Sequence, residues 1–251
     1  MAQPLILITN DDGISSPGLS ALASALEAVG EVWVYAPDRE QSAVSHGISI
    51  HRPLRVQEVG ERRFMVDGTP TDCVMLAVHE LLEGRPDLVI SGINNGANLG
   101  DDLTYSGTVA GAHEGMLLGI PSIAVSNISY QPEQMGTAAR VAAKLAAHVL
   151  EEGLPDDTLL NVNVPDVPYE ELKGAAITRM GQGTYDVEIV TRKDPRGVSY
   201  YWIGGTSPQD VARPGTDHEA VAQGRVSITP IHRDVTDDAS ISVWEQRRIE
   251  L

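Results

Sequence analysis

Short, continuous apolar runs alternate with longer segments of helical periodicity over the first two thirds of the chain. Residues 5–8 (Leu-Ile-Leu-Ile) form the first run, which is typical of a buried strand. Apolar residues then recur at helical spacing from Leu19 to Val29, and Ser16 followed by Pro17 predicts the cap and first turn of that helix. The same alternation predicts further strands at residues 32–36, 87–91, 123–125 and 159–164, and further helices at residues 69–82, 106–118 and 132–150.

Strands that alternate with helices indicate an α/β fold. Strands of a parallel sheet are buried on both faces and therefore have continuous apolar sequences, so we expect a mostly parallel sheet with helices on both sides. Residues 44–68 interrupt this pattern with a polar–apolar alternation, in which Ile48 and Ile50 precede residues 64–66. This alternation predicts a hairpin excursion.

The pattern changes from Lys173 onward, where short strand-like segments are separated by Gly, Pro and charged turns. This tail is expected to form β-hairpins attached to the core. The clearest segments are residues 175–178, 199–203 and 225–231.

The change of pattern predicts how the single domain, residues 1–251, is organised. We expect residues 1–170 to form the α/β core with the active site and residues 171–251 to form a β-rich extension. Tyr200, Tyr201 and Trp202 would expose much aromatic surface on an edge strand of a monomer. The extension is therefore predicted to build a homodimer or homotetramer.

Length and composition narrow the class of protein. The chain has 251 residues, of which 42% are hydrophobic, and no apolar run approaches the roughly 20 residues of a membrane helix. Its first residues carry no basic side chain, so no secretory signal is predicted. With Cys73 as the only cysteine, an internal disulfide and a cysteine-rich zinc site are both excluded. A cytoplasmic protein is the expectation.

The net charge of −17 limits the partners. A nucleic-acid duplex and an anionic membrane both require a basic surface, which this composition argues against. A small phosphorylated substrate is compatible with an acidic protein when a bound divalent cation reverses the local field. An acidic phosphate-binding protein is therefore expected to need a metal ion.

Polar clusters follow the first three predicted strands. They are Asn10-Asp11-Asp12-Gly13, residues 37–42 and the Asn- and Gly-rich residues 92–102. Ligands of open parallel sheets bind at the carboxyl ends of the strands, so topology should bring these clusters together. Their donors are carboxylate, amide and hydroxyl oxygens, which suit Mg²⁺ or Mn²⁺.

Each cluster also has a simpler interpretation. Asp11 and Asp12 repel each other unless a cation lies beside them. An isolated Asp-Asp-Gly is more often a solvated turn with a helix cap, but the strand before it and the two other clusters favour the cation. Ser106-Gly107-Thr108 begins a predicted helix, where free N–H groups and two hydroxyls either seat a phosphate or only cap the helix. Asn94 and Asn98 either contact a ligand or supply left-handed turn conformations.

These clusters, in this order, resemble the SurE family (survival protein E), the metal-dependent 5′/3′-nucleotidases that release phosphate from nucleoside monophosphates. The similarity covers essentially the whole chain. Its motifs are residues 8–13, Ala36-Pro37-Asp38-Arg39 leading to Ser42, residues 68–73, Ser91-Gly92-Ile93-Asn94 with Gly96 and Asn98, residues 105–109, Tyr200-Tyr201-Trp202, Gly215-Thr216-Asp217 and residues 226–230.

The resemblance implies a Rossmann-like three-layer core, a nucleoside monophosphate substrate and one divalent metal ion per subunit. It also implies that the C-terminal β-extension helps to build a dimer or tetramer. The implied metal ligands are Asp11, Asp12, Ser42 and Asn94, and the residues expected to bind phosphate are Asn10, Asn98, Ser106, Gly107 and Thr108.

The expected reaction is phosphomonoester hydrolysis, with Asp11 or Asp12 as the base for an attacking water or as the nucleophile of an aspartyl-phosphate. Two other phospho-aspartate classes are alternatives. A receiver-type domain needs an Asp at the carboxyl end of its third strand, whereas Asp87 lies at the opposite end. A haloacid-dehalogenase-type phosphatase needs Asp-x-Asp, whereas the two carboxylates are adjacent here.

Overall fold

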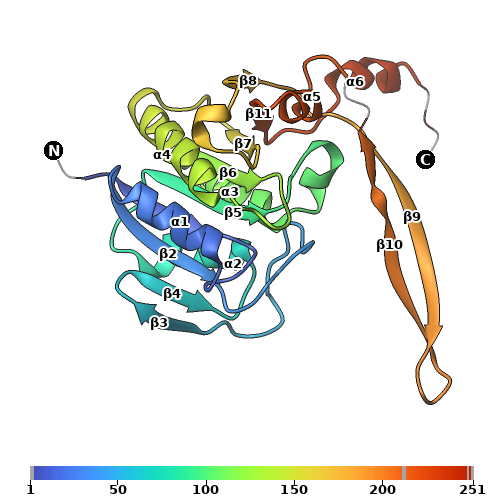
Figure 1. Ribbon diagram of the computed structural model, residues 1–251, viewed down its shortest axis with the longest axis horizontal. Coiled ribbons are helices and arrows are strands. Elements are labelled where there is room, and N and C mark those ends of the chain that lie inside the picture. The colour runs from blue at the N-terminus through green and yellow to red at the C-terminus, as the bar shows by residue number, and fades with distance from the viewer. Residues whose placement is uncertain (1–2, 211–212, 248, 250–251) are drawn as a thin grey trace.

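The computed structural model describes residues 3–210, 213–247 and 249, which fold around a nine-stranded sheet of order β3-β4-β2-β1-β5-β6-β7-β11-β8 (Figure 1). Most neighbouring strands are parallel, whereas β3 pairs with β4, and β11 with β7, in antiparallel orientation. The strands are β1 (Leu5–Thr9), β2 (Glu31–Pro37), β3 (Val56–Gly60), β4 (Arg63–Val66), β5 (Leu88–Asn95), β6 (Ser122–Asn127), β7 (Thr158–Val164), β8 (Ala175–Ile177) and β11 (Val226–His232).

Helices cover both faces of this sheet. Leu19, Leu22 and Leu26 of α1 share one core with Ala138 and Ala142 of α4, while α2 and α3 pack on the opposite face. The predicted α/β fold with a mostly parallel sheet is confirmed. The helices are α1 (Pro17–Leu26), α2 (Pro70–Leu76), the π-helical turn η1 (Ala77–Leu81), the 3-10 turns η2 (Gly100–Thr104) and η3 (Tyr169–Glu171), α3 (Gly107–Leu117), α4 (Met135–Glu152), α5 (Asp217–Ala222) and α6 (Asp238–Glu245). None of the helices within these described ranges is long and apolar enough to cross a membrane.

Two helix starts differ in how they are capped. Thr69 forms a capping box with Asp72: its hydroxyl accepts the Asp72 N–H at 3.1 Å, while Asp72 accepts the Thr69 N–H at 2.9 Å. Ser16 occupies the predicted cap position of α1 with Pro17 in its first turn, although the Ser16 hydroxyl makes no capping hydrogen bond. Pro17 presets the helical φ angle without that bond.

The excursion at residues 44–68 is a hairpin only in its second half. β3 and β4 pair as an antiparallel hairpin, and β4 adds to β2 in parallel at the sheet edge. Ile48 and Ile50 lie outside the strands and are exposed, because their alternation belongs to a loop rather than to a sheet face.

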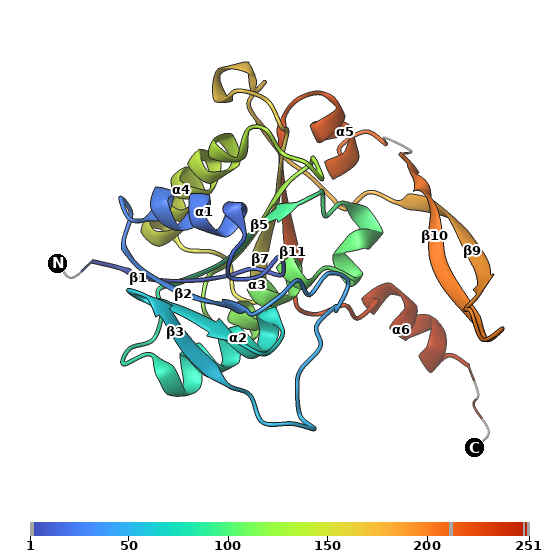
Figure 2. The ribbon, with the colours of Figure 1, turned by 60° about the horizontal axis from the view of Figure 1, so that its bottom comes forward.

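The C-terminal third contributes to the main sheet and also projects from it. β8 and β11 join the nine-stranded sheet, whereas β9 (Gly183–Lys193) and β10 (Ser199–Asp210) form a separate antiparallel hairpin that extends away from the body (Figures 1 and 2). The β-hairpin character of the tail is thus present. The boundary at residue 170 stays a prediction.

Helix α3 lies unusually close to the sheet through two glycines. A Cβ atom on Gly111 would come within 2.7 Å of Thr9 and 2.8 Å of Ser91, and one on Gly115 within 2.5 Å of the Ser122 hydroxyl. These contacts are with packed strands that have little room to move. The close approach carries the first turn of α3 toward the end of β1.

This packing predicts opposite effects for two glycine-to-alanine substitutions. We expect Gly115→Ala to destabilise the protein by about 1–3 kcal/mol through overpacking, although alanine favours a helix. Gly136→Ala is the matched control, since the space around its Cβ is open in α4, and it should stabilise by about 0.5–1 kcal/mol. Urea denaturation measures both, and equal effects of the two substitutions would contradict the close contact.

Candidate active site

The three polar clusters meet at the carboxyl edge of the sheet. The Gln41 N–H donates to the Asp11 carbonyl oxygen at 2.7 Å, and the Asn95 N–H donates to Asp12 Oδ2 at 3.3 Å. The loops after β1, β2 and β5 are therefore in direct contact, as the topology predicts. A Cβ on Gly107 would lie 2.9 Å from the Asp11 Cβ, which places the start of α3 against the same point.

Asp11 is the most enclosed carboxylate of this group. It is 5% exposed, and the Thr108 hydroxyl donates to its Oδ1. Burial raises the pKa of Asp11, and the Thr108 hydrogen bond opposes that rise without cancelling it. The site therefore disfavours the charged carboxylate unless positive charge is supplied.

Asp12 is half-buried beside it. Burial and, next, the charge of Asp11 raise the pKa of Asp12 to about 6, although the Asn95 N–H acts in the opposite direction. Two adjacent carboxylates that both resist ionisation create a local demand for a cation. This observation fits a metal ion between or beside them.

Glu40 adds a third negative charge beside Asp11 and Asp12, and this residue was not identified from the sequence. Its negative charge contributes to the raised pKa of both Asp11 and Asp12. The Ser42 hydroxyl, on an exposed residue, donates to Glu40 Oε1 at 2.7 Å. Because the hydroxyl proton points to Glu40, the lone pairs of Ser42 Oγ are the part left for a cation. The position of Glu40 inside residues 37–42 was the available signal.

Two asparagine amides at the site are oriented by short hydrogen bonds. Asn94 Nδ2 donates to the Gly96 carbonyl at 2.9 Å, and Asn10 Nδ2 donates to the Gly13 carbonyl at 3.1 Å. With the nitrogens engaged, the oxygens are the groups left for a ligand. Asn10 Oδ1 is buried and has no hydrogen-bond partner among the described residues, as expected of an atom that contacts a bound group.

The donor set is one of hard oxygen ligands. In the described part of the chain, no group of three or more His, Cys, Asp or Glu side chains gathers as a metal site. Carboxylate, hydroxyl and amide oxygens at Asp11, Asp12, Ser42 and Asn94 suit a small hard cation rather than zinc. The residues therefore fit a divalent metal ion of the Mg²⁺ or Mn²⁺ type.

The start of α3 presents its first turn to Asp11. Ser106 caps the helix, since its hydroxyl accepts the Val109 N–H at 3.1 Å, and the Thr108 side chain is fully buried in its bond to Asp11. Ser106 therefore has the capping role that was the simpler interpretation. Phosphate contacts by Ser106, Gly107 and Thr108 stay a prediction, supported by the helix terminus beside Asp11.

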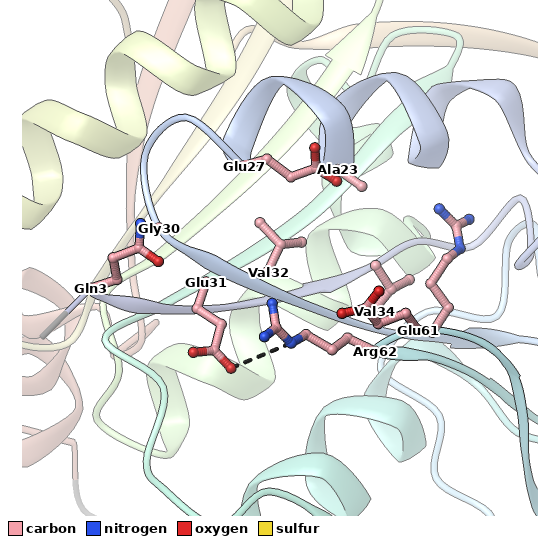
Figure 3. Close-up of a pocket in the computed structure, with 10 residues that line it drawn as sticks. Gln3, Ala23, Glu27, Gly30, Glu31, Val32, Val34, Glu61 and Arg62 are labelled. Atoms are coloured by element: carbon pink, nitrogen blue, oxygen red, sulfur yellow. Dashed lines mark ion pairs between the residues drawn. The ribbon is translucent and has the colours of Figure 1, made fainter.

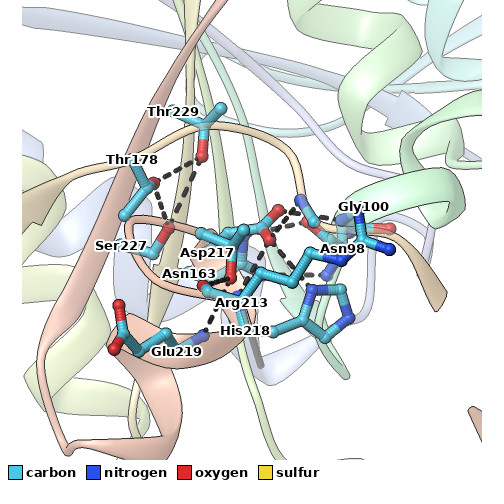
Figure 4. Close-up of polar contacts among 12 residues, drawn as sticks. Asn98, Gly100, Asn163, Thr178, Arg213, Asp217, His218, Glu219, Ser227 and Thr229 are labelled. Carbon is cyan, nitrogen blue, oxygen red and sulfur yellow. Dashed lines mark hydrogen bonds and ion pairs between the residues drawn. The ribbon is translucent and has the colours of Figure 1, made fainter. Parts of the chain in front are cut away.

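Asn98 is held by a buried polar cluster around strand β7 (Figure 4). Its N–H donates to Asn163 Oδ1 at 2.8 Å, its side chain donates to Ser126 Oγ at 2.7 Å, and its carbonyl accepts from Asn161 and Asn163, each at 2.9 Å. Phosphate binding by Asn98 stays a prediction, while these bonds give it a structural role. The sequence signal for Asn161 and Asn163 was the polar alternation inside an apolar strand.

Asp217 ties the C-terminal third to the same loop (Figure 4). Its fully buried carboxylate accepts the Gly100 and Gly181 N–H groups, each at 2.8 Å, and lies 2.9 Å from His218 Nδ1. Burial alone would raise the pKa of Asp217, but the hydrogen bonds from His218, Gly100 and Gly181 outweigh it and lower the pKa. Asp217 thereby anchors the segment between Asn98 and α3.

A second polar pocket lies at the opposite end of the strands (Figure 3). It has a volume of about 330 Å³ and contains the ion pair between Arg62 and Glu31, with Nε 3.5 Å from Oε1. Gln3 and Gly30 line it, so it faces the amino ends of β1 and β2 and is separate from the Asp11 site.

Comparisons with known proteins agree with this geometry. The family model "Survival protein SurE" matches residues 6–187. The 5′-nucleotidase SurE of Geobacter sulfurreducens is 56% identical over 241 residues, which cover 96% of this chain and 92% of that protein. That of Geotalea daltonii is 54% identical over 244 residues, with 96% and 98% covered. The crystal structure of SurE protein from Aquifex aeolicus, 45% identical, has a TM-score of 0.86 and covers 96% of this chain and 98% of its own.

The Asp217 contacts predict a pH-dependent stability. Because folding lowers its pKa, the carboxylate stabilises the folded state above its ordinary pKa of 3.8, and this contribution is lost as pH falls through the folded value. Asp217→Asn should lower the free energy of unfolding by about 1.5–3 kcal/mol at pH 7. The difference in stability between variant and parent should become smaller in acid. Thermal midpoints from pH 7 to pH 3 measure this. The exposed Asp156→Asn is the control, and a gap independent of pH would contradict the assignment.

Proposed function

The chain belongs to the SurE family, and on that premise we propose that it is a divalent-metal-dependent 5′-nucleotidase, which hydrolyses nucleoside 5′-monophosphates and also accepts 3′-nucleotides. The observation that carries this proposal is the pair of a buried Asp11 and a half-buried Asp12, both with raised pKa values, directly beside the start of α3. Carboxylates that demand a cation and a helix terminus that attracts an anion are the two halves of a phosphate-transfer site.

The other phospho-aspartate classes do not fit the geometry. Asp87, the acidic residue of the third strand, accepts the Leu5 N–H at 2.8 Å, and Leu5 begins β1 at the end opposite Asp11. A receiver-type site needs that acidic residue at the carboxyl edge. A haloacid-dehalogenase-type site needs its second carboxylate one position further along.

The chain's own residues provide most of what hydrolysis needs. Asp11, Asp12, Ser42 and Asn94 would hold a Mg²⁺ or Mn²⁺ ion, which when bound neutralises the charge that develops on the phosphate. The N–H groups of Gly107 and Thr108 at the start of α3 would orient the phosphate oxygens, and Asn10 and Asn98 would each donate the second N–H of Nδ2. Thr108 holds Asp11 in place through its hydroxyl.

Asp11 and Asp12 are also the groups able to accept a proton or to attack phosphorus. A carboxylate beside the substrate can take a proton from the attacking water, which is the role of a general base. As a nucleophile, the carboxylate would attack phosphorus while the P–O bond to the nucleoside breaks and the nucleoside leaves, and water would then hydrolyse the aspartyl-phosphate to phosphate. Trapping with hydroxylamine during turnover separates the two roles, because only the acyl phosphate reacts.

The direct test is phosphate release from a panel of nucleoside 5′- and 3′-monophosphates, with Mg²⁺, Mn²⁺ or a chelator. We expect turnover of the 5′-nucleotides with metal and none with chelator. Activity that persists in chelator, or hydrolysis of a generic phosphomonoester without any preference for nucleotides, would contradict the proposal.

Asp12→Asn should abolish turnover and leave the fold intact. The neutral amide weakens binding of the cation and relieves the repulsion with Asp11, so the thermal midpoint without metal should stay level or rise. The increase in midpoint that Mg²⁺ or Mn²⁺ produces in the parent should be lost. Asp101→Asn, an exposed carboxylate in η2, is the matched control. A drop in metal-free stability with activity retained would show that Asp12 is only structural.

We further propose that the β9–β10 hairpin assembles the chain into a homodimer or homotetramer. Tyr201, Trp202 and Ile203 are 63%, 65% and 82% exposed on a hairpin that extends from the body (Figure 2). Surface of this kind is typical of a protein interface.

Shortening this hairpin should reduce the oligomeric state without removing any residue proposed for the site. Glu188 pairs with Gly204, so replacing residues 189–203 with Asn-Gly keeps the strand base and closes it with a favoured turn. Multi-angle light scattering should give an oligomer for the parent and a smaller species for the variant. A monomeric parent would contradict the assembly proposal and leave the proposed reaction untouched.

A further inference from the structure

A third cavity lies on the α2 face of the sheet, with Leu5 at one end and Tyr35, which is level with Thr9, toward the other, and we name it the aromatic cavity. It has a volume of about 660 Å³, within the range of small-molecule sites, and its lining includes Trp33, Tyr35, Phe64, Glu58 and the residues that follow η1. Leu5, at the amino end of β1, also lines it. At about 3.3 Å per strand residue, this end of β1 is roughly 20 Å from Asp11.

The floor of the aromatic cavity is a row of stacked rings on one face of the sheet. Phe64 stacks on Trp33, with ring centroids 5.8 Å apart, and on Tyr35, with centroids 4.6 Å apart. Strand register places Tyr35, Phe64 and Glu58 side by side on three adjacent strands. Helix α2 packs on β1 and β2, whereas β4 and β3 lie beyond it at the sheet edge, which leaves this face hollow.

The Tyr35 hydroxyl is the polar group that this cavity leaves without a partner. The residue is 1% exposed, and no hydrogen bond joins its hydroxyl to another described side chain or backbone group. The oxygen is not one of the fully buried unpaired atoms, so it faces the water of the cavity, where a ligand donor can take the place of water. Burial and the nearby charge of Glu58 raise the pKa of Tyr35, so the phenol stays neutral.

The charged residues that line the aromatic cavity in the described ranges are all acidic. Glu31, Glu58 and Glu83 line it, and its lining residues in the described ranges include no Lys, Arg or His. Arg62 lies beside it and pairs with Glu31, and its Cζ is 6.0 Å from the Trp33 ring centroid. The protein's own guanidinium thus shows that a cation is accepted against this ring. Glu58 and Glu83 are the carboxylates left for a ligand.

We propose that the aromatic cavity binds an organic amine, with its ammonium group at Glu58 and the Tyr35 hydroxyl and its apolar body against Phe64 and Leu82. The stacked rings and Leu82 provide apolar surface, and the carboxylates favour a cation over a neutral or anionic molecule. An anionic nucleotide is excluded by the same charges, so this site is distinct from the proposed phosphatase site and does not depend on it.

Trp33 fluorescence provides the test, in a chain whose other two tryptophans are replaced (Trp202→Phe, Trp244→Phe). Phenethylammonium is the probe, and 2-phenylethanol and 3-phenylpropanoate are its neutral and anionic counterparts. We expect saturable binding of the ammonium compound and at least tenfold weaker binding of the other two. Tyr35→Phe and Glu58→Gln should each raise the dissociation constant of the ammonium compound at least threefold.

Glu27→Gln, which lines the pocket on the opposite sheet face (Figure 3), is the charge-matched control and should bind the probe normally. Nucleotide turnover should be unchanged in Tyr35→Phe, which separates this proposal from the phosphatase proposal. Equal binding of the alcohol, or full affinity in both cavity variants, would overturn the amine site. No saturable signal from any probe, as when a second copy of the chain covers the cavity, would overturn it as well.

Discussion

Burial of two adjacent carboxylates at the carboxyl edge of the sheet is the constraint on which the rest of this structure depends. Asp11 and Asp12 are held where desolvation and mutual repulsion both raise their pKa values. The nearby donors, the Thr108 hydroxyl and the Asn95 N–H, reduce that cost without removing it. The same desolvation and repulsion that raise these pKa values would be offset by a cation bound beside the pair, which is the basis of the proposed function.

Two features position this site: the close packing of α3 on the sheet, and the hydrogen bond that Asp217, near the end of the chain, accepts from the loop before α3. Gly107 and Gly111 allow the helix to approach Asp11 and Thr9 more closely than any side chain would permit. Asp217, more than a hundred residues away in the chain, fastens Gly100 in the loop that leads into the helix. The C-terminal third is therefore part of the architecture of the site as well as a source of exposed hairpin surface.

How far the site could be predicted depended on the range of the interactions involved. The sequence predicted that the clusters containing Asp11, Ser42 and Asn94 lie together, because each follows a strand of a parallel sheet and such strands end at one edge. Their role as metal ligands was implied by the family resemblance and stays a prediction. Glu40 was missed because its effect depends on distance to the carboxylates. The hydrogen bonds of the buried asparagines of β7 to Asn98, and that of Asp217 to Gly100, were missed because the partners are remote in the chain.

The sequence by itself determined the alternation of strands and helices, the burial of the central strands and the edge at which chemistry is concentrated. These follow from local periodicity and from the rule that parallel strands share a direction. The tertiary structure alone decided that β11 pairs antiparallel with β7, that β9 and β10 leave the sheet, and that a stack of rings stays open beside the short α2. The physical reason is that the pattern of a strand records which of its faces is buried, whereas its hydrogen-bonding partner and the helix above it depend on contacts between distant segments.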